Sequence, residues 1–416
     1  MHRAPLRPPR GVTLVELMVA VAISLVVLAA ILGVVNTQQK AYFDGQKQRE
    51  AQGSGREALR VIEEALLLAG YGMDAPLAFD FDRYEGPCPA QLYPCPRDAI
   101  ADSDEIVFFH RNPRYWVPKV YTDPYAGNAW RVLGLTAGTV SVEARLGDRF
   151  LKGQILQAVC KSGTEFAYFT VGETATATAA GALDVTLLAA DDETDPFLRQ
   201  DDALNAIRSA CFLSGEARVF LIERHRFHVR PVDTGNGLEP FLMHDQGVDL
   251  NLDDTVDAGD EIAVAGGVEL LQFGYVLTNP LLAMRGGTPG TAIAFAAGDL
   301  GTASTEGLTT LQFPGPPQGN LPAYRATSFY GYTLGPPAHD RRLTDHQANI
   351  RAVRVAVRAR SAVADRSAPA LPEALTPLLN LNALPAWIDA NDRYNRVTFV
   401  SAVPLRNMVV RAMNDF

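Results

Sequence analysis

The chain has 416 residues, which corresponds to about two to three domains, although a large all-β fold can form a single domain. Hydrophobic residues make up 47% and charged residues 20%, so a sizeable core is possible and bulk disorder is excluded. The formal net charge of −10 argues against a general affinity for nucleic acid, because phosphate binding requires clustered Lys and Arg.

The first 35 residues combine a basic leader with a long apolar segment. Residues 1–11 contain three arginines and three prolines but no acid, and residues 12–35 carry a single charge at Glu16. As a helix, the apolar run is long enough to cross a bilayer. The arginines before it predict a cytoplasmic N-terminus, which places the remaining chain on the far side of the membrane.

Three interpretations of this segment compete. A secretory signal peptide has a shorter apolar core, followed by a small-residue cleavage site that is not evident here. An uncleaved signal anchor fits the length and the orientation. It leaves Glu16 unexplained, because a carboxylate deep in a membrane helix costs about 2.5–3.5 kcal/mol or more.

The third interpretation rests on the sequence R-G-V-T-L-V-E-L-M-V-A, which resembles the class III signal of type IV prepilins. The resemblance implies that prepilin peptidase cuts after Gly11 and methylates the new N-terminus at Val12. It also implies that Glu16 docks against the α-amine of a neighbouring subunit, and a buried charge needs such a partner. Pilins most often begin with Phe, whereas this mature chain would begin with Val. Removing three arginines lowers Lys+Arg from 37 to 34 against 47 acids, for a net charge of −13.

Beyond the transmembrane half at 12–35, a periplasmic half of the same helix is expected within residues 36–74. Strong helix formers favour a helix that continues to about residue 69. An apolar stripe at helical spacing predicts its core-facing side: Leu59, Ile62, Leu66 and Ala69. Gly70 or Gly72 is the expected cap, and three earlier glycines are positions where the helix could bend or melt: Gly45, Gly53 and Gly55.

Residues 75–416 predict a β-rich, mainly antiparallel head, so the expected fold class is α+β with the long N-terminal helix packed on that head. Expected strands are Glu105–His110, Thr139–Glu143, Ile155–Val159, Glu165–Val171, Arg218–Arg230, Ala263–Leu277, Ile350–Arg360 and Arg396–Leu405. Residues 279–345 are rich in Gly, Pro, Thr and Ala, which predicts a weakly structured surface insertion. Residues 365–392 indicate a second loop.

The four cysteines have no C-x-x-C spacing, which argues against a zinc knuckle or a redox motif. Outside the cytoplasm an even number favours disulfides. The expected pairs are Cys88–Cys95 and Cys160–Cys211. Four cysteines allow three pairings, and buried free thiols are the alternative.

Residues 249–260 read D-L-N-L-D-D-T-V-D-A-G-D and predict a calcium loop. Oxygen-bearing side chains fall at loop positions 1, 3, 5, 9 and 12, and the seventh residue can offer its carbonyl: Asp249, Asn251, Asp253, Asp257, Asp260 and Thr255. The pattern resembles the dockerin variant of the EF-hand, in which Asp closes the loop. It departs at the sixth position, where Asp254 replaces Gly. The alternative is a solvated acidic turn between strands.

Several segments of the chain resemble PilW-type minor pilins, in that family's order. They are G-R-E-A-L-R-V-I-E-E-A-L-L-L-A-G-Y-G, S-D-E-I-V-F-F, G-Q-I-L-Q-A-V-C, E-F-A-Y-F-T-V, G-V-E-L-L-Q-F-G-Y-V, R-A-V-R-V-A-V-R-A-R-S and V-T-F-V-S-A-V-P-L-R-N. The resemblance implies a minor pilin of the type IV pilus that primes assembly and enters the fibre near its tip, with links to twitching motility and cell adhesion. A minor pseudopilin of type II secretion, usually much smaller, is the near alternative. A membrane-anchored calcium-binding or adhesive protein that never polymerises is the third.

The implied partners are other minor and major pilins, prepilin peptidase and the inner-membrane assembly platform. The expected location is the inner membrane, with a single span and a periplasmic head that later joins the extracellular pilus. No catalytic motif such as G-x-S-x-G or H-E-x-x-H occurs, so a non-enzymatic role is expected, with no required cofactor beyond a possible calcium ion. His225 and His228 are three apart on an expected strand, so they would point to opposite faces and make a poor metal pair.

Overall fold

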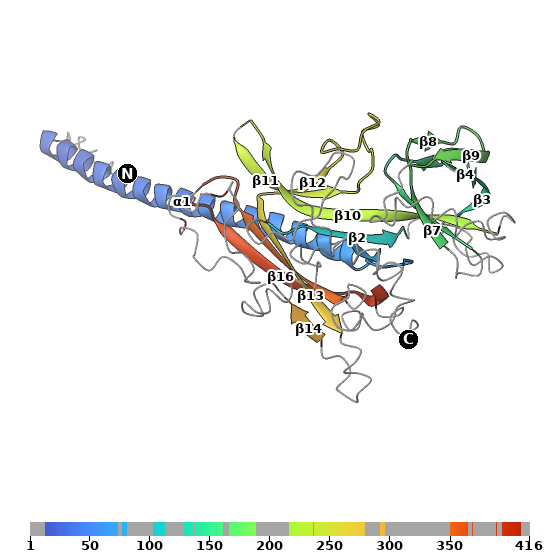
Figure 1. The fold of residues 1–416 in the computed structure, drawn as a ribbon. Coiled ribbons are helices and arrows are strands. Elements are labelled where there is room, and N and C mark those ends of the chain that lie inside the picture. The colour runs from blue at the N-terminus through green and yellow to red at the C-terminus, as the bar shows by residue number, and fades with distance from the viewer. Residues whose placement is uncertain are drawn as a thin grey trace, which may run out of the picture.

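The structure is a computed structural model that describes residues 13–73, 77–80, 103–112, 129–136, 138–160, 166–188, 216–235, 237–278, 292–295, 350–364, 368, 388 and 393–408. In these ranges a long helix, α1, is followed by strands β1 to β16 (Figure 1). Strand pairings are antiparallel throughout both main sheets. The α+β fold class expected from the sequence is therefore confirmed.

Helix α1 spans Leu14–Leu66 and begins with a capping box at Thr13. Its C-terminal cap is Leu67, in right-handed helical conformation, so the predicted glycine cap is wrong. Gly70 instead takes a left-handed φ of 76° three residues later, where its N–H donates to the Phe109 carbonyl at 2.9 Å. A Cβ at this glycine would lie 2.6 Å from the Met408 sulfur, so close packing in the turn requires Gly.

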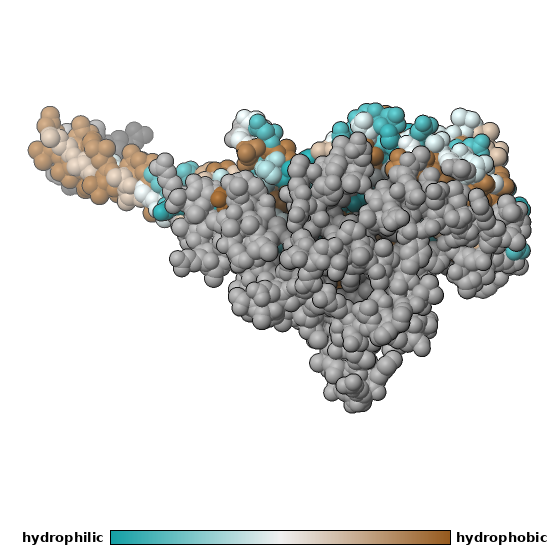
Figure 2. Space-filling view, in the orientation of Figure 1, coloured by the Kyte–Doolittle hydropathy of each residue, from teal (hydrophilic) through white to brown (hydrophobic). Residues whose placement is uncertain are grey.

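The first half of α1 projects from the head (Figure 1). By length and composition it can cross a membrane, and none of its apolar window is buried in the structure. Figure 2 shows this projecting segment as an almost unbroken hydrophobic surface that gives way to polar residues near the head. A helix that is apolar all round requires a lipid or protein environment on every side.

The second half of α1 packs into the head through one face. Its buried residues recur at helical spacing: Ala51, Gly55, Ala58, Ile62 and Leu66. The helix stays continuous across the three glycines where it was expected that it could bend or melt, so it does not melt there. At Gly55 the missing side chain permits close packing, because a Cβ there would lie 2.6 Å from Cε2 of Phe399.

The larger sheet is organised around the 16-residue strand β10. Among the described residues ten strands join it, in the order β1-β2-β10-β3-β4-β9, with β6 and β11 also paired to β10, β7 to β6 and β12 to β11. These strands are β1 (Phe79–Asp80), β2 (Ile106–Arg111), β3 (Ala129–Thr136), β4 (Thr139–Ala144), β6 (Ile155–Val159), β7 (Phe166–Thr170), β9 (Gly181–Thr186), β10 (Arg218–Asp233), β11 (Leu238–Asp245) and β12 (Ile262–Gly266). The start of β10 pairs with β3 and β6, and its remainder pairs with β2 and β11.

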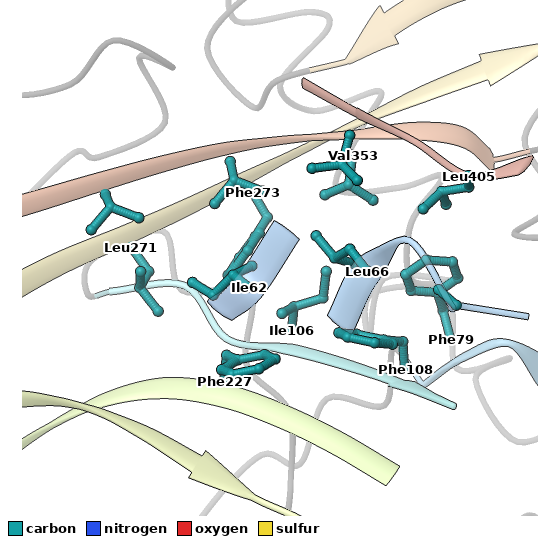
Figure 3. Close-up of a cluster of buried hydrophobic side chains, with 14 of the residues drawn as sticks. Ile62, Leu66, Phe79, Ile106, Phe108, Phe227, Leu271, Phe273, Val353 and Leu405 are labelled. Carbon is teal, nitrogen blue, oxygen red and sulfur yellow. The ribbon is translucent and has the colours of Figure 1, made fainter. Parts of the chain in front are cut away.

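The second sheet has the order β14-β13-β15-β16. Its strands are β14 (Ala292–Phe295), β13 (Val268–Thr278), β15 (Ile350–Arg360) and β16 (Arg396–Pro404). The end of α1 lies between the two sheets (Figure 3). Ile62 and Leu66 lie in one buried cluster with Phe273 and Val353 of the second sheet and with Phe227 of the larger sheet. This buried cluster fixes the helix to the head.

One strand prediction in the head is wrong in detail. The single strand expected at 263–277 is divided at Gly267, whose φ is 75° and whose Cβ would lie 2.5 Å from the Arg360 carbonyl. The chain therefore leaves the larger sheet after β12 and enters the second sheet as β13. Of the insertion expected at 279–345, the structure describes residues 292–295, whose apolar run A-I-A-F forms strand β14 on the edge of β13. The weakly structured insertion stays a prediction.

A separate hydrophobic cluster lies under β3, β4, β6, β7 and β9, away from α1. Beside it β5 (Arg149–Phe150) pairs with β8 (Ala175–Thr176). This part of the head contributes nothing to the helix-packing core, so the head contains more than one buried cluster.

Candidate functional site

The N-terminal end of α1 carries the residues predicted to act in assembly. Gly11 and Val12 lie outside the described residues, which begin at Thr13. The Thr13 N–H and hydroxyl donate to Oε2 of Glu16 at 2.9 and 3.0 Å, and the Glu16 N–H donates back to the hydroxyl at 3.3 Å. The carboxylate thus sits at the positive end of the helix dipole.

This arrangement leaves one carboxylate oxygen for an external partner. Both hydrogen bonds that Glu16 accepts use Oε2, and among the described residues Oε1 has no donor. The side chain is exposed on a helix whose neighbouring surface is apolar. In a chain cut after Gly11, the new amine belongs to Val12, directly before the capping residue. Glu16 can therefore accept from a second chain while its capping bonds persist.

The predicted calcium loop is a closed, hydrogen-bonded turn between β11 and β12. The Asp249 carboxylate accepts from the N–H groups of Leu252, Asp253 and Asp254 at 2.6, 3.2 and 3.0 Å. The Asp260 carboxylate accepts from Leu250 N–H at 2.7 Å, from Asn251 N–H at 3.1 Å and from Asp257 N–H at 3.0 Å. Both carboxylate side chains are buried. The hydrogen bonds to Asp260 join the last position of the loop to its start.

The backbone of this loop meets one requirement of the EF-hand turn. Asp254 has a left-handed φ of 67°, so it adopts the conformation for which an EF-hand uses glycine at the sixth position. The flanking elements are strands rather than helices. Asn251 and Thr255 bond to the carboxylate of Asp253 instead of pointing to a common centre, and Asp257 bonds to Gly259. Calcium binding here remains a prediction.

Of the four cysteines, Cys88, Cys95 and Cys211 lie outside the described residues. Cys160 follows β6, is fully buried and is disulfide-bonded. Its partner falls in a part of the chain that the structure does not describe, so the Cys160–Cys211 pairing stays a prediction.

A cluster of histidines that was not predicted lies on one face of the larger sheet. His110 on β2 is directly opposite Glu223 on β10, and His225 follows on the same face, opposite Phe108. His244 on β11 completes the group, with its Nε2 2.9 Å from Nδ1 of His225. Burial lowers the pKa of His110 and His225 to about 4, and that of His244 to about 3, so all three rings are neutral near pH 7.

No local sequence signal could have found this cluster. His110 is 115 residues from His225 along the chain, and strand register alone brings the two together. The prediction that His225 and His228 point apart is correct, because His228 faces Glu261 at 3.3 Å instead.

The comparison with protein families finds a match at the start of the chain. Residues 6–32 match the prokaryotic N-terminal methylation motif. No curated protein and no solved structure matches the chain. The matched residues include the last six residues of the predicted leader, from residue 6 to Gly11, together with Val12 and Glu16, and they run into the exposed apolar part of α1.

The motif and the long helix support a type IV pilin-like protein, that is, a pilin or a pseudopilin. The motif implies processing by prepilin peptidase and assembly with other pilins in general. The apolar helix fits an anchor in the inner membrane.

Proposed function

We propose that this chain is a minor pilin of the PilW type in the type IV pilus, with a structural and non-enzymatic role. It waits in the inner membrane with its head in the periplasm, helps to prime assembly, and enters the fibre near the tip. Its contacts are with other minor pilins, major pilins and the assembly platform, and twitching motility and surface adhesion depend on the resulting fibre.

One observation carries this proposal: the methylation motif at residues 6–32 leads into an exposed apolar helix that is packed firmly on a β-rich head. The exposed segment from residue 14 to 35 rises about 33 Å as a helix, which matches a hydrocarbon core of about 30 Å. The same apolar surface can pack against other pilin helices when the subunit leaves the bilayer.

Charge pairing at the start of the helix favours the assembled subunit over the subunit alone in the membrane. In the membrane the Glu16 carboxylate is costly, and only the capping bonds from Thr13 compensate it. In a fibre the cationic amine of a neighbour's first residue can bind Oε1. Unpaired subunits are therefore less stable in apolar surroundings than paired ones.

The mature N-terminus tests the processing step. Mass spectrometry of the protein purified from cells with active prepilin peptidase is expected to show a methylated chain that starts at Val12. Gly11→Val should leave residues 1–11 attached, whereas the control Val12→Phe, which introduces the residue pilins most often have, should still be cut. Retention of the leader in the unaltered protein contradicts the proposal.

A deletion strain separates the minor pilin from the alternatives. Loss of surface pili and of twitching, with normal secretion of type II substrates, is the expected result. Normal pili with blocked secretion would identify a pseudopilin. Normal pili and normal secretion, together with a chain that never appears in sheared fibres, would identify a membrane-anchored protein that does not polymerise.

A second proposal is that residues 249–260 bind calcium. It is supported by the left-handed backbone at Asp254 and by the buried carboxylates of Asp249 and Asp260 at the first and last loop positions. Binding requires the side chains of Asp253 and Asp257 to turn toward the ion. Isothermal titration of the purified protein with calcium should give heat that Asp260→Ala removes, and no heat at millimolar calcium would reject the proposal.

A further inference from the structure

The histidine cluster has the atoms and spacing of a metal site. Nε2 of His110 lies 2.8 Å from Nε2 of His225, and Oε2 of Glu223 lies 3.6 and 3.7 Å from those two nitrogens. Among the described residues, these three side chains form a group in which each offers one potential ligand atom and all three atoms lie within 4.8 Å of one another. Tetrahedral zinc holds its ligand atoms about 3.3 Å apart. The cluster therefore needs shifts on the order of 0.5 Å to hold the ion.

Hydrogen bonds on the outer nitrogens leave the inner nitrogens suited to bind a metal. Nδ1 of His110 lies 3.0 Å from the Arg111 carbonyl, which can only accept, so the ring carries its proton on Nδ1 and a lone pair on Nε2. In the ion-free protein Nε2–H of His225 donates to that lone pair, and Nε2–H of His244 donates to Nδ1 of His225.

Besides these small shifts, metal binding requires a change of tautomer. When the proton of His225 moves to Nδ1, its Nε2 becomes a ligand and its Nδ1–H donates to His244, whose own proton then lies on Nδ1. Three neutral rings carry three protons before and after the change. Each ligating histidine then has an outer hydrogen-bond acceptor, which is the usual arrangement around a protein metal.

The surrounding side chains hold these groups in place. The His225 ring is stacked between its neighbours, 5.3 Å from Phe108, 4.7 Å from His110 and 5.0 Å from His244 between ring centroids. Oε1 of Glu223 accepts a hydrogen bond from the Asn112 side chain, which leaves Oε2 directed at the two imidazoles. His110 and His225 are buried, whereas Glu223 is half-buried and gives an ion a route from solvent.

We propose that His110, Glu223 and His225 bind a divalent transition metal ion, with zinc as the best fit. Two imidazoles and one carboxylate suit zinc and disfavour calcium and magnesium, which prefer oxygen ligands. Three protein ligands leave a fourth position for water or for another ligand. The ion would link β2 to β10, two strands whose ligating histidines are 115 residues apart in the sequence.

The test uses the full chain in detergent micelles after removal of metal with EDTA. Zinc titrated against a chromophoric chelator should bind at one equivalent with an affinity that exceeds that of either ligand variant at least ten-fold. Cobalt should give the visible absorption of a four-coordinate site. The first variant is His225→Phe, which keeps the ring stack, and the second is Glu223→Gln, which keeps the acceptor for Asn112.

The matched control is His228→Gln. It removes a buried histidine that lies on the opposite face of β10 from His225 and that pairs with Glu261. It should bind zinc like the unaltered chain. Circular dichroism identifies any variant that fails to fold. If His225→Phe does not fold, the test rests on Glu223→Gln, whose position is only half-buried. Absence of zinc binding at millimolar concentration, or unchanged affinity in Glu223→Gln, overturns the proposal.

Discussion

Two glycines in the same helix, Gly53 and Gly55, should respond in opposite ways to substitution by alanine. Both occupy helix interior positions, where alanine is favoured over glycine by roughly 1 kcal/mol. Gly53 is exposed and a Cβ there would meet nothing within 4 Å, so Gly53→Ala should stabilise the protein by about that amount.

At Gly55 the same methyl group would meet the second sheet. Its Cβ would lie 2.6 and 2.8 Å from Cε2 and Cδ2 of Phe399 and 3.2 Å from Cβ of Ala359. These atoms belong to β16 and β15, so relief requires a shift of a ring or of a strand. Such overpacking costs about 1–3 kcal/mol. Helix propensity cancels between the two variants, so Gly55→Ala should be less stable than Gly53→Ala by that cost.

Guanidinium unfolding of the full chain in detergent micelles, followed by circular dichroism, measures the difference as a shift in midpoint at constant slope. The folding equilibrium should differ about 5-fold or more between the variants. Adding Phe399→Leu should recover part of the loss in Gly55→Ala, because it removes the ring edge. Equal stability of Gly53→Ala and Gly55→Ala would refute close packing between α1 and β16.

Three further changes probe other parts of the chain. Glu269→Ala should lower the free energy of unfolding by about 3–5 kcal/mol, because it removes a fully buried carboxylate that lies 2.7 Å from Arg396 and 3.9 Å from Arg358; chemical unfolding measures the loss. Glu16→Gln should preserve the capping box and leader cleavage but reduce recovery of the chain in sheared pili, as followed by immunoblot. Leu252→Gly should stabilise the protein by up to about 1 kcal/mol in thermal unfolding, because Leu252 is exposed with a left-handed φ of 65°; a loss of stability would show that its side chain contributes packing.

The strands that could be predicted are those whose own residues favour a sheet. The bounds predicted for β6 and β15 match the structure, because β6 is an apolar run broken once by Gln157 and β15 places Ile, Val and Ala between its four arginines. Strand β9 was missed because G-A-L-D-V-T carries little β-propensity. Strand β11 contains Pro240, which normally argues against a strand inside a sheet. Pairing with β10 and β12 overrides that local preference.

The candidate sites also differ in whether a local sequence pattern or the assembled fold defines them. The assembly signal is contained in 27 consecutive residues, so a local pattern is enough to predict it. The reason for a glycine at position 55 lies outside the helix, because its Cβ would meet Phe399 of β16, and the sequence of the helix alone does not reveal that contact. The cluster of His110, Glu223 and His225 depends on the register between β2 and β10, which is fixed by the whole head.

The structure also separates where changes should affect assembly from where they should affect folding. From Ala58 on, the buried face of α1 is part of the same core as β2, β10, β13 and β15. Asn407 after β16 donates to the Leu67 carbonyl at 3.1 Å, so force on the helix is transmitted to both sheets. Before Val35 the described helix residues are exposed and none of the apolar window is buried, so these side chains are available to lipid or to other helices. A polar substitution on the projecting half should therefore leave the fold of the head intact while it changes insertion or assembly. A substitution at Ile62 should do the reverse, because that side chain lies between both sheets.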